Sequence, residues 1–89
     1  MEQTIKRIKY MESVFDEVQN AFMEGNDIED ALLKEKIRIL IQYYESEQWK
    51  MDYTADERGE LPVDLKRGVL SEDGVYNLLS DIESLQKKD

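Results

Sequence analysis

The sequence contains no cysteine and no histidine. Without cysteine, the chain has no disulfide, no thiol nucleophile and no thiolate metal site. Without histidine, it lacks the commonest general base, the commonest zinc ligand and the side chain that titrates near neutral pH without perturbation. Haem, iron–sulfur and structural zinc sites are therefore not expected, and we predict no cofactor.

Long hydrophobic runs are also missing. The longest uninterrupted ones, such as residues 39–41, are far shorter than the roughly 20 apolar residues that a membrane-spanning helix needs. The opening MEQTIKRIKYME is amphipathic from its first turn and has no apolar stretch typical of a signal peptide. We therefore expect no contact with a membrane and a cytoplasmic location.

Positive charge is scarce, since 12 basic residues face 21 acidic ones and give a formal net charge of −9. The acidic excess is spread along the chain, which favours solubility and argues against binding nucleic acid or anionic lipid. A length of 89 residues predicts one domain, 1–89. Hydrophobic residues make up 40% and recur periodically, so we do not expect a disordered chain.

Apolar residues recur at helical spacing in three stretches, which predicts an all-α domain of three helices. The first covers about 2–24 and ends at Gly25, a residue suited to the left-handed position after a helix. The second covers about 27–53, and a short loop makes these two an antiparallel hairpin. The third covers about 72–86, with Ser71 as its N-cap.

The second predicted helix, capped by Asn26 or Asp27, is apolar on more than one face. Such a helix is usually central, so we expect it to pack against both other helices. Nothing before Gly59 interrupts it. On the first helix, the side expected to face water carries Lys6, Lys9, Glu12, Asp16, Glu17 and Gln19.

Residues 59–70 are predicted to form an ordered loop. Gly59 and Pro62 interrupt the helical period, and proline disfavours helix at the residue before it. A single helical turn is expected near residues 64–67. The apolar residues that we expect to pin the loop to the helices are Leu61, Val63 and Leu65.

The same region carries a family resemblance. Residues 55–62 read ADERGELP, residues 68–73 read GVLSED, and Trp49, Asp52-Tyr53, residues 64–66, residues 75–79 and the N-terminal start fit the same pattern. Together they make the chain similar to domain-of-unknown-function family 4298. The resemblance implies a small, acidic, cytoplasmic bacterial protein with no assigned activity, and it brings no catalytic or binding residue with it.

We interpret the chain as a non-catalytic helical module that binds an unidentified protein partner, or itself, through segment 49–76. Large amphipathic side chains and charged residues of this segment are of the kinds found at interfaces. The candidate surface comprises Trp49, Tyr53, Asp56, Arg58, Glu60, Asp64 and Tyr76. Trp49 could instead cover the core, and Arg58 could clamp Asp52, Glu60 or Asp64 in a forked ion pair.

Two alternatives stay open. The carboxylates of residues 52–64 could hold a hard cation such as Mg²⁺ or Ca²⁺, or serve a small enzyme or ligand-binding protein. Their spacing does not match a calcium-binding EF-hand loop, and we assign no catalytic or metal-binding residue. A weaker alternative is an acidic mimic of nucleic acid.

Overall fold

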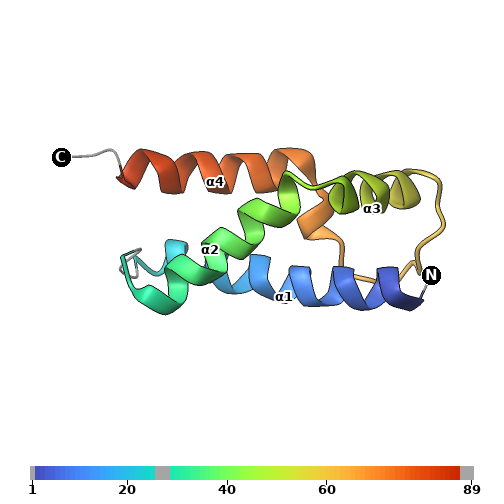
Figure 1. Cartoon of the computed structure of the whole chain (residues 1–89), viewed down its shortest axis with the longest axis horizontal. Coiled ribbons are helices and arrows are strands. Elements are labelled where there is room, and N and C mark those ends of the chain that lie inside the picture. The colour runs from blue at the N-terminus through green and yellow to red at the C-terminus, as the bar shows by residue number, and fades with distance from the viewer. Residues whose placement is uncertain (1, 26–28, 87–89) are drawn as a thin grey trace.

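The computed structural model describes residues 2–25 and 29–86. These residues contain helices and no β-strand, which confirms the all-α prediction (Figure 1). The elements are α1 (Glu2–Met23), α2 (Ala31–Tyr44), α3 (Glu47–Glu57), the 3-10 helix η1 (Gly68–Leu70) and α4 (Glu72–Gln86). The expected helix over 27–53 is therefore wrong, because two helices, α2 and α3, occupy that stretch.

Ser46 separates α2 from α3. Its backbone is extended (φ −93°, ψ 161°), so the α2 conformation ends before it. The Ser46 Oγ donates to the Tyr43 carbonyl at 2.6 Å and accepts from the Trp49 N–H at 3.2 Å. One hydroxyl thus bonds the end of α2 and caps the start of α3, which makes the break stable.

The other helix ends follow ordinary capping chemistry. The cap expected at Asn26 or Asp27 lies outside the described residues, and α2 begins at Ala31 with the Asp30 carboxylate accepting from the Leu33 N–H at 3.2 Å. Ser71 Oγ accepts from the Gly74 N–H at 3.2 Å, which confirms the predicted cap of α4.

Two glycines close the helices before them. Gly25 follows α1 with φ 75°, and Gly59 follows α3 with φ 71°. The Gly59 N–H donates to the Asp56 carbonyl and the Glu60 N–H donates to the Ala55 carbonyl, both at 3.0 Å, which is a Schellman ending. The left-handed backbone expected at Gly25 is therefore confirmed, and Gly59 adopts the same conformation.

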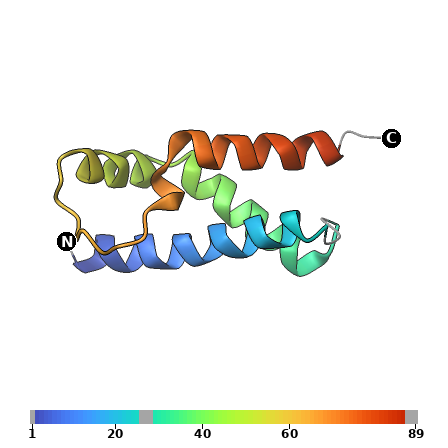
Figure 2. The same cartoon turned by 180° about the vertical axis from the view of Figure 1, so that it is seen from behind.

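The helices form an elongated body of 44 × 19 × 18 Å. Viewed as in Figure 1, α1 lies along one long edge, α4 along the other, and α2 crosses between them. The chain after α3 turns around the N-terminal end of α1 and runs back along it to η1 (Figure 2). This path places η1 in contact with α1, α3 and α4.

The core is continuous through all elements. From α1 it takes Ile8, Met11, Val14, Phe15 and Val18, and from the loop and η1 it takes Leu61, Leu65, Val69 and Leu70. Two of the three loop residues expected to pin the loop are thus buried, whereas Val63 is 93% exposed. The helical turn expected at 64–67 occurs instead as η1, a few residues later.

The expectation that the second helix would be central holds only in part. α2 packs against α1, whereas it slants away from α4, as Figure 1 shows, and a depression lies between α2 and α4. Leu32, on the outer face of α2, is 76% exposed, and Ile41 also reaches the surface. The element that contacts α1, α3 and α4 together is η1 and not α2.

Candidate functional site

The conformation of segment 49–76 depends on one residue whose backbone is wholly buried. Val69 is 0% exposed. Its N–H donates to the Glu12 Oε1 at 2.8 Å, and its carbonyl accepts from the Trp49 Nε1 at 3.0 Å. A buried backbone group without a partner would cost about 1–3 kcal/mol, so these two side chains fix η1 between α1 and α3.

Gly68 permits the close approach of η1 to α1. A Cβ at this position would lie 3.1 Å from Glu12 Oε2 and 3.4 Å from Phe15 Cε2. The first distance is tighter than ordinary contacts, so a side chain here would push the Glu12 carboxylate away from its bond with Val69.

The structure corrects the prediction made for Glu12. It was expected on the water-facing side of the first helix, yet it is 93% buried, with 7% of its surface exposed. Its carboxylate accepts a hydrogen bond from the Val69 N–H. This contact depends on how η1 packs against α1, so the sequence of the first helix alone does not predict it. A charged residue directly after the core residue Met11 was the only local hint.

A second buried polar cluster joins α1, α2 and α3. Asp52 is 1% exposed and accepts three hydrogen bonds. Arg7 Nε donates to Oδ2 at 2.9 Å, Arg7 Nη2 donates to Oδ1 at 2.5 Å, and the Tyr43 hydroxyl donates to Oδ2 at 2.5 Å. The forked guanidinium and the phenol together satisfy the carboxylate, which makes its burial tolerable.

The protonation behaviour follows from this geometry. Burial, followed by the hydrogen bond and charge of Asp52, raises the pKa of Tyr43 well above its ordinary value. The hydrogen bond to Asp52 raises the pKa of Arg7. Tyr43 and Arg7 are protonated at neutral pH in any case, and the two raised pKa values extend this to more alkaline pH.

Arg58 does not make the predicted clamp. Its side chain forms no ion pair within the described residues, whereas Arg7 holds Asp52 and Arg67 holds Asp56 at 2.9 Å. The backbone of Arg58 instead caps the C-terminus of α3. An arginine does pair with Asp52, as predicted, but this arginine is Arg7 and not Arg58.

Aromatic rings form a row from α3 to the end of α2. The Trp49 ring stacks on Tyr53 with centroids 5.1 Å apart and meets Tyr44 edge to face at 5.1 Å. Trp49 is buried, so of the predicted candidates it belongs to the core, while Tyr53 and Tyr44 are partly exposed. Tyr76 of α4 lines a groove together with Tyr44 and is 60% exposed. We call Tyr44, Trp49, Tyr53 and Tyr76 the aromatic row.

Acidic side chains surround this row. The charge of Glu57 is the main cause that raises the pKa of Tyr53, with Glu72 contributing. Burial raises the pKa of Tyr44, helped by Glu72 and Asp73. The exposed rims of the aromatic row therefore lie in a negative field.

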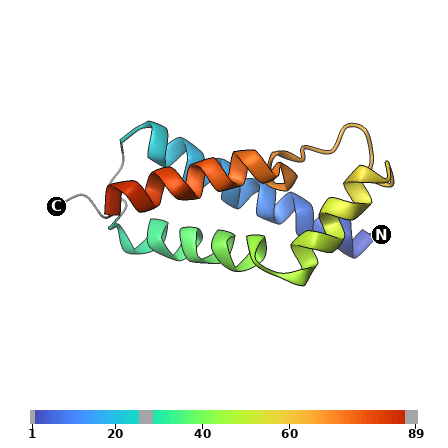
Figure 3. The same cartoon turned by 90° about the horizontal axis from the view of Figure 1, so that it is seen from above.

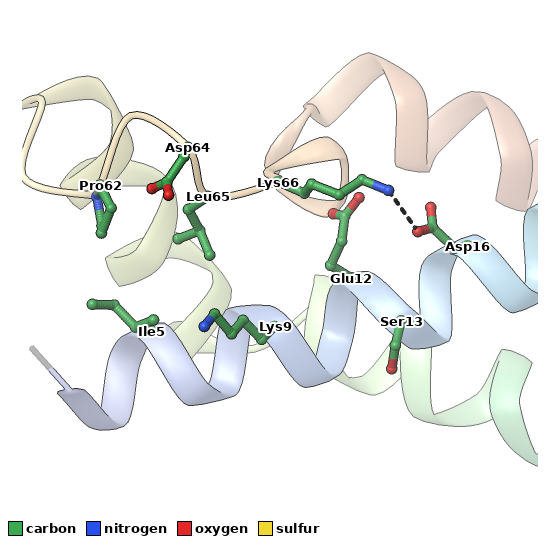
Figure 4. Close-up of a pocket in the computed structure, with 9 residues that line it drawn as sticks. All are labelled: Ile5, Lys9, Glu12, Ser13, Asp16, Pro62, Asp64, Leu65 and Lys66. Atoms are coloured by element: carbon green, nitrogen blue, oxygen red, sulfur yellow. Dashed lines mark hydrogen bonds and ion pairs between the residues drawn. The ribbon is translucent and has the colours of Figure 1, made fainter.

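The remaining candidate residues separate from one another. Asp64 borders a cleft of about 400 Å³ between α1 and the loop, where Lys66 Nζ lies 3.4 Å from Asp16 Oδ2 (Figure 4). Glu60 and Arg58 border a different cleft, together with Arg7 and Lys50. Of the carboxylates in residues 52–64, Asp52 and Glu60 border this second cleft, Asp64 borders the first, and Asp56 pairs with Arg67. The described part of the chain contains no group of three or more acidic residues positioned to hold a metal ion.

A third depression lies between α2 and α4 and has a volume of about 420 Å³. Its lining includes Ile37, Ile41 and Tyr44 from α2 and Tyr76, Leu79 and Ile82 from α4. The sequence reading missed this groove, although the extra apolar positions of the second predicted helix were its signal.

The family is shown by comparison with known proteins. A family model described as a domain of unknown function (DUF4298) matches residues 8–88, and the chain belongs to this family. No curated protein and no solved structure matches the chain significantly. In the described ranges, none of the helices has the length and apolar character needed to cross a bilayer.

Proposed function

We propose that this chain is a non-catalytic helical interaction module that binds a protein partner through segment 49–76 and the helix faces beside it. The observation that supports it most is the aromatic row. Its inner member, Trp49, is fixed by the bond to Val69, and its outer members Tyr53 and Tyr76 remain accessible. Aromatic side chains held rigid at a surface lose little entropy on binding, which is why they dominate interface energetics.

The rigidity of the segment also supports this proposal. Both backbone groups of Val69 are bonded by side chains, and no buried side-chain nitrogen or oxygen in the described ranges lacks a partner. A surface that is already ordered avoids the cost of ordering on association.

The electrostatics favour a basic partner. The exposed parts of the aromatic row lie beside Glu57, Glu72 and Asp73, and the whole chain has a net charge of −9. A partner with Lys or Arg would gain from this field and from cation–π contacts with the tyrosines. Two copies of the chain would repel each other, so we favour a different protein over self-association. We place the partner in the bacterial cytoplasm, as the family resemblance implies.

The test is affinity capture from native cells followed by mass spectrometry. The test bait carries Tyr53→Ala and Glu57→Lys, which remove an exposed ring and reverse the charge beside it. The matched control bait carries Tyr10→Ala and Glu2→Lys, because Tyr10 is 56% exposed and the Glu2 side chain 86% exposed, and both lie on α1 outside the aromatic row. We expect a partner that wild type and control retain and the test bait loses. A partner retained equally by all three baits would contradict the proposed surface.

Self-association is tested separately by analytical ultracentrifugation across micromolar concentrations. We expect a monomer throughout. A concentration-dependent dimer would make a second copy the partner and would contradict the charge argument.

A further inference from the structure

We infer that the groove between α2 and α4 is the docking site for a short amphipathic helix of the partner, with apolar residues on one face and Lys or Arg on the other. This inference rests on the proposed function and names the class of ligand. It arises from three observations: an apolar floor left open between two helices, a rim of one charge sign, and a length that fits two helical turns.

The floor and walls of the groove are apolar. Ile37 and Ile82 form its buried part, at 6% and 3% exposure. Ile41 is 36% exposed and Tyr76 is 60% exposed, so the walls offer surface that the chain itself does not cover. Two helices with such a seam commonly accept a third helix, which inserts anchors spaced three or four residues apart.

The length of the groove sets the length of the ligand. Its lining residues extend from Ile37 to Glu45 on α2 and from Tyr76 to Glu83 on α4. The two helices run in opposite directions, as Figure 3 shows. Eight residues of helix rise about 12 Å, or a little more than two turns. A docked helix would therefore present about three anchors, at positions i, i+3 or i+4, and i+7.

The rim distinguishes this groove from the other two clefts of similar size. Its charged lining residues are Glu45 and Glu83, and no basic side chain belongs to the described lining. The cleft along α1 includes lysines as well as carboxylates, and the cleft at Asp52 includes two arginines and a lysine. The basic residues Lys34 and Arg38 of α2 line an adjoining depression that shares Ile37 and Ile41 with the groove. They pair with Glu29 and Glu35. A partner complementary to the groove is therefore apolar in the middle and basic at its edges.

A second copy of the chain fits this rim poorly. Although α2 itself carries more basic than acidic residues, each copy as a whole has a net charge of −9, so two copies repel each other as they approach. A partner helix of opposite charge would have the attraction instead.

The experiment uses two model peptides of about 15 residues, with leucine at i, i+3, i+4 and i+7 on one face. One peptide carries lysine on the polar face and the other carries glutamate. Two-dimensional ¹⁵N–¹H NMR titration of the full chain reports where each binds. We expect the lysine peptide to shift amides of residues 37–45 and 76–83, and the glutamate peptide to leave the spectrum unchanged.

Variants make the test specific. Ile41→Ser with Tyr76→Ser should weaken binding of the lysine peptide at least about tenfold. The matched control is Tyr10→Ser with Val63→Ser, which changes exposed apolar residues elsewhere and should alter affinity less than about twofold. Glu45→Lys, compared with Glu2→Lys at the far end of the body, should weaken the lysine peptide without touching the apolar floor.

The outcomes separate the two proposals. Shifts centred on the α1 cleft, equal binding of both peptides, or a dimer that the Ile41→Ser and Tyr76→Ser variant dissociates would each overturn the groove inference. In the capture experiment, a partner lost by Tyr53→Ala/Glu57→Lys and kept by Ile41→Ser/Tyr76→Ser would overturn the groove alone and leave the interaction module standing. A partner lost by neither variant would overturn the module's surface as well.

Discussion

Replacing Asp52 by alanine tests the buried ion pair most severely. The change removes a carboxylate that is 1% exposed and leaves the guanidinium of Arg7 and the hydroxyl of Tyr43 without their acceptor. Removing one partner of a buried ion pair costs about 3–5 kcal/mol. The Arg7 side chain is 24% exposed, so water can solvate part of it, and we expect a loss near the lower value, about 3 kcal/mol.

That loss is large for this chain. A domain of 89 residues has a stability of about 4–13 kcal/mol, and 1 kcal/mol shifts the melting temperature of a domain of this size by about 4–8 °C. Asp52→Ala should therefore melt about 12–24 °C below wild type. The assay is urea and thermal unfolding followed by circular dichroism and by the fluorescence of Trp49, the single tryptophan.

The control replaces the whole cluster by apolar residues, with Arg7→Met, Tyr43→Phe and Asp52→Leu together. Because no charge then remains buried without a partner, this variant should lie within about 2 kcal/mol of wild type. The reasoning is refuted if Asp52→Ala loses less than about 1 kcal/mol, or if the apolar variant is as unstable as the single one.

Three further predictions concern the helix ends and the alkaline limit. Gly59→Val should destabilise the domain by about 1–2 kcal/mol, because φ is 71° there and a Cβ meets nothing within 4 Å, so the cost is backbone strain alone; equal melting temperatures would contradict this. Ser46→Ala should cost about 1 kcal/mol by removing the cap of α3, measured by urea unfolding, with Ser84→Ala on the exposed face of α4 as a control near zero. Stability should fall as pH rises above about 10, because the unfolded chain then loses the Tyr43 proton that the native state keeps; Tyr43→Phe should flatten this fall, and an unchanged slope would contradict the assignment.

Hydrophobic periodicity was sufficient to place the outer helices. The predicted stretches 2–24 and 72–86 agree with α1 and α4 to within one residue. Apolar residues three and four apart can only gather on one side in a helix, so the pattern and the structure have the same cause. The positive φ of Gly25 and Gly59 followed equally from local chemistry.

The break at Ser46 was missed because apolar and aromatic residues continue on both sides of it. The local signal was present: Ser46 is followed by Glu47, as Ser71 is followed by Glu72 at the start of α4. A serine before an acidic residue predicts an N-cap at both places, but the cap was predicted only at Ser71.

The partners of the buried polar groups could not be predicted from the sequence. Arg7 and Asp52 are 45 positions apart, and Glu12 and Val69 are 57 positions apart. Local patterns specify which residues share a helix face, whereas these pairs depend on how whole helices lie against each other. The same limit explains why Arg58 was preferred to Arg7 and why Glu12 was expected in water.

The α2–α4 groove was not predicted. The surplus of apolar positions on the second predicted helix was taken as a sign of a central helix, and the second wall of the groove, formed by Tyr76 and Leu79, comes from a helix more than 30 residues later. Which apolar face remains open depends on the tilt between helices, and no pattern within one helix contains that tilt.

The hydrogen bonds that Glu12 and Trp49 form with Val69 fix η1 between the helices, and the order of segment 49–76 and its aromatic row depends on them. Native-state hydrogen exchange of the Val69 amide measures this directly. We predict protection equal to that of core amides such as Ile8 and Leu40, lost in Glu12→Ala. Exchange of the Val69 amide at the rate of an open loop would contradict the central claim.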